Sequence, residues 1–339
     1  MNSKKSIHKM KQWKIKNLVI KNQIVIAPMA GVSNLSFRSI LASYQPGLIY
    51  SEMISDKAIV YRNEKTIAMT QVNSDEHPIA LQLFGEDIKT MVLAAQYLDT
   101  KTDCDIIDIN MGCPVPKVIK GSGGASLLKR PAYAFELAKA VVDAVNKPVT
   151  VKLRVGWDNQ TINVIEMALG LQASGISALS IHGRTRSAMY SGSVDYDLIR
   201  QVKELLDIPV MANGDITTLA EAKHVLAYTK ADAIMIGRGV LGKPWFIKEL
   251  IDGLDGLAYN EPDSEQRFNI ARQHALNLIE SVGEKHAMQQ MRSHFTWYLK
   301  GMPRSHQIKN AITQMTSYEQ FDRIIKEYQA ELDKMVTYE

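Results

Sequence analysis

The sequence predicts an α/β chain, a (β/α)8 TIM barrel followed by a small all-α helical domain. From Ile24 to Ile236, one pattern recurs eight times: a short β-branched run, a loop of Gly, Asn or Pro, and a longer segment with helical periodicity. After Lys248 the pattern changes to helix alone. Because an open doubly wound sheet rarely repeats so evenly, we expect the eight strands to close into a barrel.

Eight runs have the length and composition of buried parallel strands. In chain order they are Ile24–Ala27, Leu48–Tyr50, Ile79–Phe84, Ile106–Ile109, Val149–Leu153, Ala178–Ile181, Val210–Ala212 and Ala233–Ile236. Helical periodicity fills the segments between them, and Pro131 suits the first turn of a helix. The clearest helix candidates are Ala132–Val145, Thr161–Ala173, Asp195–Leu206 and Thr218–Tyr228.

The composition changes along the chain divide it into four parts. We expect a basic N-terminal extension over residues 1–17 and the barrel over residues 18–250. A connector rich in Gly, Asn, Pro and acidic residues follows over 251–264. The helical domain then occupies residues 265–339.

The charges are placed unevenly, although the formal net charge of the 339 residues is only +4. No acidic residue precedes Glu52, whereas lysines and Arg38 do. A second acid-free stretch runs from His286 to Tyr318 and mixes basic with aromatic side chains. Two basic regions on a nearly neutral body favour a polyanionic partner.

The two cysteines, Cys104 and Cys113, precede and follow the same predicted strand. A disulfide between them would have to span that strand, so we expect two reduced thiols and a cytoplasmic location. No run has the length and apolar character needed to cross a membrane, and residues 1–21 lack the apolar stretch of a signal peptide.

Cys113 is the residue whose surroundings indicate chemistry most clearly. It follows a β-branched strand, with Gly112 on one side and Pro114 on the other. Glycine permits a positive φ and proline cannot continue a strand ladder, so the thiol should project from a turn at the carboxyl end of the strand. Parallel α/β enzymes place their catalytic groups there. A small apolar filler would not need such a turn.

Polar residues follow the other predicted strands as well. Lys152 has the alternation of an inward-pointing residue, and an ammonium in a barrel interior needs an anionic partner. Glycines and Arg238 after the seventh and eighth strands suit a phosphate. Sugar phosphates, pyridoxal phosphate and flavin mononucleotide (FMN) all remain possible from these residues alone. The edges of a flavin ring suit the polar groups after strands one, three and five.

Six motifs together resemble the flavin-dependent tRNA-dihydrouridine synthases, in the order typical of that family. They are Ala27–Val32, Asn110–Pro114, Val151–Trp157, Ile181–Arg186, Asn213–Ile216 and Ile236–Gly239. The likeness covers nearly the whole chain. In the tail, the residues that resemble the bacterial B-like branch are Arg292, His294, Trp297, Tyr298, Lys300 and Gly301.

The resemblance implies a reaction and a set of site residues. NADPH would reduce bound FMN, the flavin N5 would give hydride to C6 of a tRNA uridine, in the D-loop by the resemblance, and Cys113 would protonate C5. The implied FMN contacts are Pro28, Met29, Ala30, Gln82, Lys152, His182, Asn213, Gly214, Asp215, Gly237 and Arg238. Asn110 is expected to hold the uracil edge. No metal and no obligate protein partner are expected.

The implied substrate needs an RNA-binding surface, because a uridine must leave its stack before it can be reduced. The expected phosphate contacts at the barrel mouth and on the helical domain are Lys117, Lys120, Arg184, Arg186, Arg292, Lys300, Arg304 and Lys309. Trp297 and Tyr298 are equally consistent with base stacking and with core packing.

Three other functions fit parts of the sequence. A barrel of the dihydroorotate dehydrogenase kind would act on a free pyrimidine and would not need the basic tail. An aldolase could form a Schiff base through Lys152. A non-catalytic RNA-binding barrel would not need Cys113 or the cofactor motifs.

Overall fold

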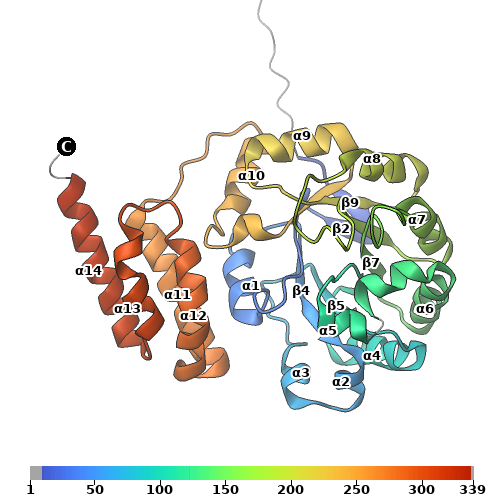
Figure 1. Cartoon of the computed structure of the whole chain (residues 1–339), viewed down its shortest axis with the longest axis horizontal. Coiled ribbons are helices and arrows are strands. Elements are labelled where there is room, and N and C mark those ends of the chain that lie inside the picture. The colour runs from blue at the N-terminus through green and yellow to red at the C-terminus, as the bar shows by residue number, and fades with distance from the viewer. Residues whose placement is uncertain (1–9, 122, 337–339) are drawn as a thin grey trace, which may run out of the picture.

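The computed structural model describes residues 10–121 and 123–336, and it confirms the predicted α/β class. Eight parallel strands form a closed barrel in the order β10-β3-β4-β5-β6-β7-β8-β9 (Figure 1). Their bounds are β3 (Ile24–Ile26), β4 (Leu48–Ser55), β5 (Ile79–Phe84), β6 (Ile106–Met111), β7 (Val149–Arg154), β8 (Ala178–His182), β9 (Val210–Asn213) and β10 (Ala233–Ile236). Several strands run further at the carboxyl end than predicted, because pairing with their neighbours continues into the polar residues there.

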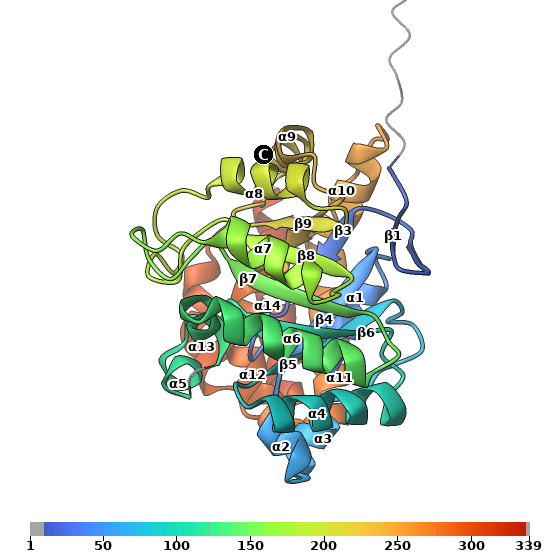
Figure 2. The same ribbon diagram turned by 90° about the vertical axis from the view of Figure 1, so that its right-hand side faces the viewer.

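Helices cover the outside of the barrel (Figure 2). They are α1 (Leu35–Ala42), α2 (Asp56–Val60), α3 (Glu64–Ala68), α4 (Ile88–Lys101), α5 (Pro116–Lys120), α6 (Pro131–Ala144), α7 (Val164–Ala173), α8 (Tyr196–Leu205), α9 (Leu219–Thr229) and α10 (Phe246–Leu254). Short 3-10 helices occur at η1 (Gly124–Lys129) and η2 (Arg238–Val240). Outward strand residues such as Ile49 and Leu81 pack with these helices in one continuous apolar core.

A β-hairpin closes the barrel at the end opposite the polar strand exits. It consists of β1 (Trp13–Ile15) and β2 (Leu18–Ile20), which pair antiparallel. Its buried residues join the inward-facing barrel residues in a separate apolar cluster. The boundary expected after residue 17 falls inside this hairpin, so the part of the chain that packs with the barrel begins before residue 18. The earlier lysines of the basic extension, in residues 1–9, lie outside the described residues.

The helical domain has a core of its own. It contains α11 (Ser264–Val282), α12 (Glu284–Tyr298), η3 (Ser305–Ile308), α13 (Lys309–Gln314) and α14 (Tyr318–Val336). Asp263 caps α11 in a reciprocal capping box with Gln266. The expected connector begins inside α10, because that helix continues to Leu254. Within the described residues, no helix has the length and apolar character to span a membrane.

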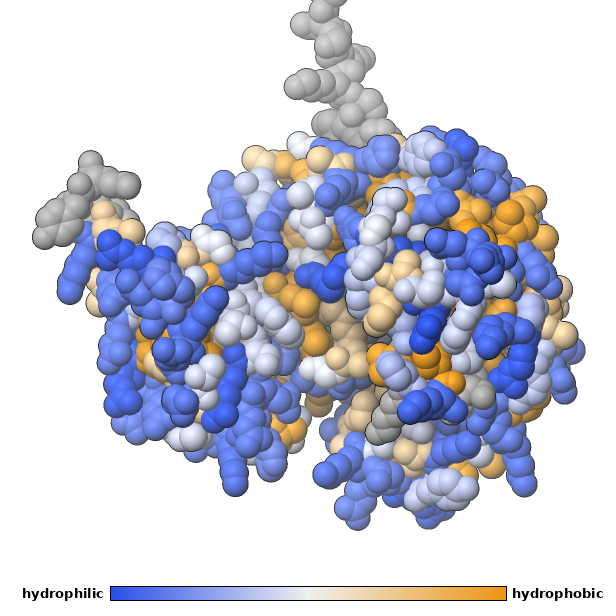
Figure 3. Space-filling model, viewed as in Figure 1, coloured by the Kyte–Doolittle hydropathy of each residue, from blue (hydrophilic) through white to orange (hydrophobic). Residues whose placement is uncertain are grey.

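The two lobes meet through α1, which lies between the barrel and α11 (Figure 1). Phe37 of α1 stacks on His274 of α11, with ring centroids 5.2 Å apart. Asn34, the N-cap of α1, donates from Nδ2 to Gln290 Oε1 of α12 at 3.4 Å. The space-filling view shows a hollow between the lobes on this face (Figure 3). The segment that follows β3 therefore contacts both the barrel mouth and the helical domain.

Candidate active site

One cavity of ≈ 370 Å³ opens at the carboxyl ends of the barrel strands, a volume within the range of small-molecule sites. Its walls come from residues within β4, β5 and β7, from the segment after β3, and from the ends of β6, β8, β9 and β10 with the segments that follow them. Barrel closure brings together Cys113, Asn110 and all the expected cofactor contacts, namely Pro28, Met29, Ala30, Gln82, Lys152, His182, Asn213, Gly214, Asp215, Gly237 and Arg238.

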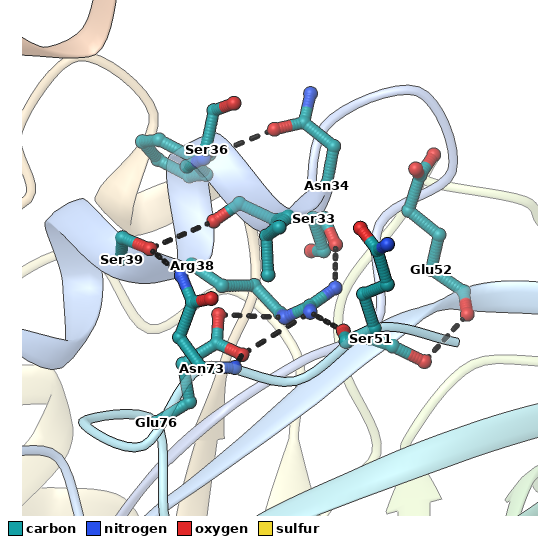
Figure 4. A network of polar contacts seen from close by, with 12 residues as sticks. Ser33, Asn34, Ser36, Arg38, Ser39, Ser51, Glu52, Asn73 and Glu76 are labelled. Atoms are coloured by element: carbon teal, nitrogen blue, oxygen red, sulfur yellow. Dashed lines mark hydrogen bonds and ion pairs between the residues drawn. The ribbon is translucent and has the colours of Figure 1, made fainter. Parts of the chain in front are cut away.

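A buried polar network centred on Arg38 supports the segment that follows β3 (Figure 4). The Arg38 guanidinium pairs with Glu76, at 3.1 Å from Nε to Oε1, and also donates to the Ser33 carbonyl. The Ser33 hydroxyl accepts from the Met29 N–H at 3.1 Å, and the Glu52 carboxylate accepts from the Gly31 N–H. Arg38 is thus buried and cannot contribute to the basic surface where the sequence suggested it.

Cys113 lies half-buried in the cavity wall, in the segment between β6 and α5. Asn110 Oδ1 accepts from the backbone N–H groups of Gly112 at 3.1 Å and Cys113 at 2.9 Å. Gly124 has φ +56°, and a Cβ there would lie 3.2 Å from the Cys113 Cβ. Only glycine therefore allows this close approach. Burial raises the pKa of the Cys113 thiol, so the group is protonated at neutral pH.

Lys152 supplies a buried ammonium to the cavity. Its Nζ donates to Asn213 Oδ1 at 3.0 Å. Burial lowers the pKa of Lys152 to about 8, and the Asp108 carboxylate opposes that shift. Asp108 is fully buried in the barrel interior, where burial raises its pKa to about 6. Both groups are therefore charged near pH 7, which gives the predicted interior ammonium its anionic neighbour.

His182 lies beside a tyrosine that the sequence analysis does not single out. The pKa of His182 falls to about 2, first because of burial and then because of nearby cations, so the imidazole is neutral. The Tyr190 ring also lines the cavity, with its centroid 4.4 Å from Arg238 Cζ and 5.6 Å from Arg154 Cζ. Tyr190 belongs to the loop between β8 and α8, so only the folded loop reveals that its ring faces the cavity.

Arg154 connects two loops of the site, a role that its position at a strand end does not predict. Its Nε donates to the Gly112 carbonyl at 3.0 Å. Its Nη1 donates to the carbonyls of Thr185 at 2.8 Å and Met189 at 2.7 Å. Arg154 therefore ties the Cys113 segment to the loop after β8.

The structure corrects the role expected for Arg184. The side chain is 3% exposed and its guanidinium forms two bonds to the Asp215 carboxylate. It also donates to the carbonyls of Ser191 and Gly192. Because its donors are engaged inside the protein, Arg184 braces the loop after β9 and does not offer its charge to a surface phosphate. Asp215 also pairs with Arg238, at 3.4 Å.

Asn110 lines the cavity, but its carboxamide already bonds protein groups. Its Oδ1 accepts hydrogen bonds from two backbone N–H groups. Its Nδ2 donates to Gln82 Oε1 at 2.7 Å. The second N–H of Nδ2 meets only Met53 Sδ, at 3.9 Å, so it is the one group of the carboxamide left for a uracil edge. The geometry makes Asn110 a support of the Cys113 segment.

Comparison with known proteins decides the family. The family model "Dihydrouridine synthase (Dus)" matches residues 25–335. The chain belongs to the tRNA-dihydrouridine synthase family. It is 42% identical over 299 residues to "tRNA-dihydrouridine synthase B" of Pasteurella multocida, covering 87% of this chain and 90% of that protein. It is 37% identical over 304 residues to "Probable tRNA-dihydrouridine synthase" of Rickettsia conorii, covering 89% and 92%.

Two solved structures share the fold at low identity. The 2-naphthoyl-CoA reductase complex has a TM-score of 0.56 and 13% identity, covering 73% of this chain and 52% of that one. The old yellow enzyme homologue from Zymomonas mobilis has a TM-score of 0.52 and 15% identity, covering 76% and 95%. The family membership confirms the predicted branch, B-like, and the predicted class of enzyme. This dihydrouridine synthase is an oxidoreductase that reduces uridine to dihydrouridine in tRNA.

The expected RNA contacts of this dihydrouridine synthase are not equally accessible. The side chain of Lys117 lies outside the described set, whereas Lys120 is exposed on α5. Arg186 stacks over the Trp157 ring, with Cζ 4.5 Å from the centroid. The Arg292 guanidinium donates to the Met315 carbonyl from both Nε and Nη2. Of the four expected contacts on the helical domain, Lys300, Arg304 and Lys309 are exposed.

A second hollow of ≈ 460 Å³ lies where Gly31 of the barrel faces α12. Trp297 and His294 line it, together with polar residues of the same helix. Tyr298 instead points into the helical core, where its hydroxyl lies 3.3 Å from His274 Nδ1. Of the two adjacent aromatics, only Trp297 is therefore placed at a surface that RNA could reach.

Proposed function

We propose that this dihydrouridine synthase holds FMN in the cavity at the barrel mouth, takes its reducing equivalents from NADPH, and uses Cys113 as the acid that protonates C5 of the uracil. The observation that carries this proposal is the position of one protonated thiol in the wall of the cavity that also contains Lys152. We further propose a cytoplasmic enzyme, because both Cys104 and Cys113 are free thiols.

The residues of the cavity fit a flavin phosphate and ring. An added Cβ on Gly237 would meet nothing closer than the Ala27 Cβ at 3.8 Å, so the bare backbone faces open space where an anion could approach. Arg238 stands beside it with 56% of its side chain exposed and can complete a phosphate site. Lys152 and the neutral His182 offer N–H donors to the carbonyl edge of a flat heterocycle.

When bound, FMN would supply the hydride for C6 of the uracil. Lys152 would stabilise negative charge at the edge of the ring that it contacts. Cys113 would hold a proton at Sγ and release it to C5, which a thiol with a raised pKa can do because it is not already ionised. Asn110 and Arg154 would keep the Cys113 segment in place through their bonds to its backbone.

The substrate's size fits the two-lobed form of the molecule. A uridine in folded tRNA must leave its stack to reach the cavity, and contacts elsewhere on the RNA must offset that cost. We propose that the helical domain binds the RNA body through its exposed cations and through the hollow beside Trp297. A free pyrimidine would not need this lobe, and the tRNA-acting relatives cover both lobes.

The test compares two cysteine variants. Cys113→Ala should bind FMN and tRNA and still accept reducing equivalents from NADPH, yet form no dihydrouridine, as measured by nucleoside mass spectrometry. Cys104→Ala is the matched control, because Cys104 is a buried thiol at the opposite end of β6. Dihydrouridine at near-normal rates in Cys113→Ala would remove Cys113 from the role of proton donor.

A further inference from the structure

A line of hydrogen bonds runs from the barrel interior to the Cys113 backbone. Asp108 Oδ2 accepts from Gln82 Nε2 at 2.6 Å. Gln82 Oε1 accepts from Asn110 Nδ2 at 2.7 Å. Asn110 Oδ1 then accepts from the N–H groups of Gly112 and Cys113. At its inner end, Asp108 Oδ1 accepts from the Thr150 hydroxyl at 2.6 Å. The line runs from Asp108 of β6 to Gln82 of β5 and back to Asn110 of β6. It therefore depends on the register in which β5 pairs with β6.

Both ends of this line set the same direction, because the backbone N–H groups of Gly112 and Cys113 can only donate and the ionised Asp108 carboxylate can only accept. A carboxylate accepts hydrogen bonds and cannot donate them, whereas a carboxamide does both and can face either way. Asp108 therefore forces Gln82 to present its NH₂ group inward and its oxygen to Asn110. Asn110 must then turn its own NH₂ toward Gln82, which leaves its oxygen for the Cys113 segment. Asp108, Gln82 and Asn110 are 0%, 1% and 7% exposed, so water does not readily replace a lost partner.

We propose that Asp108 is a positioning residue for Cys113, because its buried carboxylate orients the Gln82 and Asn110 carboxamides and through them fixes the backbone that carries the thiol. The inference rests on the proposed function in one respect, because that function gives the Cys113 thiol its catalytic role. Asp108 itself touches neither the cavity nor the Cys113 side chain. Its pKa of about 6 means that it is ionised, and can only accept, at the pH of the tests.

The sharpest test reverses the direction of the line. Asp108→Asn alone should keep the hydrogen-bond line, because the new amide can still accept from Gln82 while it donates to Thr150. Since it also removes the anionic neighbour of Lys152, this variant is compared by Cys113 alkylation alone. Asn110→Asp alone should be impaired, because at the high pH of the assay two acceptors must then face each other on one side of Gln82 or the other. The double variant Asp108→Asn/Asn110→Asp should recover, because Gln82 can turn around and every group again has a partner.

The readout is the rate at which iodoacetamide alkylates the Cys113 thiolate, taken at the high-pH plateau so that a shifted thiol pKa does not enter. We expect about a tenfold change for Asn110→Asp, which is what one unsatisfied buried polar group amounts to, and a return to within about twofold of wild type in the double variant. Dihydrouridine formation should likewise fall in Asn110→Asp and recover in the double variant. If Asn110→Asp is insoluble, recovery of soluble protein in the double variant is the equivalent result.

A control variant is available, and failure of the positioning role can be distinguished from failure of the proposed acid role. Ser180→Ala changes another buried residue of the barrel interior, whose hydroxyl contacts Met211 Sδ at 3.5 Å, and should leave both readouts unchanged. A double variant no better than Asn110→Asp alone would overturn the positioning role of Asp108. Since alkylation requires no tRNA and no turnover, it tests positioning even if Cys113→Ala proves to be fully active and the proposed acid role is lost.

Discussion

Removing the three exposed cations among the expected phosphate contacts of the helical domain should weaken tRNA binding in a way that salt reveals. The variant is Lys300→Ala/Arg304→Ala/Lys309→Ala. The sequence suggests four phosphate contacts in this region, but the structure leaves three fully exposed, because the guanidinium of Arg292 bonds the Met315 carbonyl at 3.2 and 2.9 Å. Each phosphate contact contributes about 0.7 to 0.9 to the slope of log K against log salt, so the slope should fall by roughly 2 to 3.

The assay is tRNA binding by fluorescence anisotropy at several salt concentrations. Lys65→Ala/Lys101→Ala/Lys223→Ala is the matched control, because it removes the same charge from exposed positions on the outer barrel helices α3, α4 and α9. The control should keep the wild-type slope, which separates local phosphate contacts from a general loss of positive charge. A triple variant with unchanged slope and affinity would show that Lys300, Arg304 and Lys309 have no part in RNA binding.

Two further predictions concern single buried residues. Lys152→Met should weaken FMN binding by about 10- to 100-fold, the value of a charge-assisted hydrogen bond, and should lower the flavin midpoint potential; unchanged flavin content and potential in spectroelectrochemistry would move Lys152 away from the cofactor. Burial lowers the pKa of His294 to about 4 from the ordinary 6.5, so the folded state binds fewer protons than the unfolded state between these values and stability falls as the pH drops through them. His294→Gln should remove up to about 3 kcal/mol of that pH dependence in urea unfolding, and equal slopes for the two proteins would contradict the assignment.

The local sequence pattern predicts most of the barrel because each strand is coded within its own few residues. β5 has the predicted bounds, and β10 does as well. β3 ends one residue before the predicted bound, and the other strands end later, where polar residues such as Asn110 and Arg154 extend the pairing beyond the apolar run. The sequence also predicts the cavity wall, since the carboxyl ends of parallel strands meet at one mouth once the barrel closes.

Side-chain partners could not be predicted in the same way, because they come from distant elements. Arg38 and Arg184 look like surface cations in the sequence, yet Glu76 and Asp215 neutralise them inside the fold. Tyr190 lies in an irregular loop whose direction no periodicity determines. The N-terminal boundary shifted for a similar reason, since a short hairpin gains its stability only by packing against the barrel interior.

The sequence by itself determined the fold class, the family resemblance and the displayed thiol, because strand alternation and the turn around Cys113 are local properties of neighbouring residues. Only the tertiary structure decided which cations remain free for RNA and how Cys113 is supported. Those outcomes depend on burial and on hydrogen bonds between separate strands, as in the line from Asp108 through Gln82 to Asn110. The partner of a buried charge comes from whichever element packs beside it, and the spacing of residues in the sequence does not identify that element.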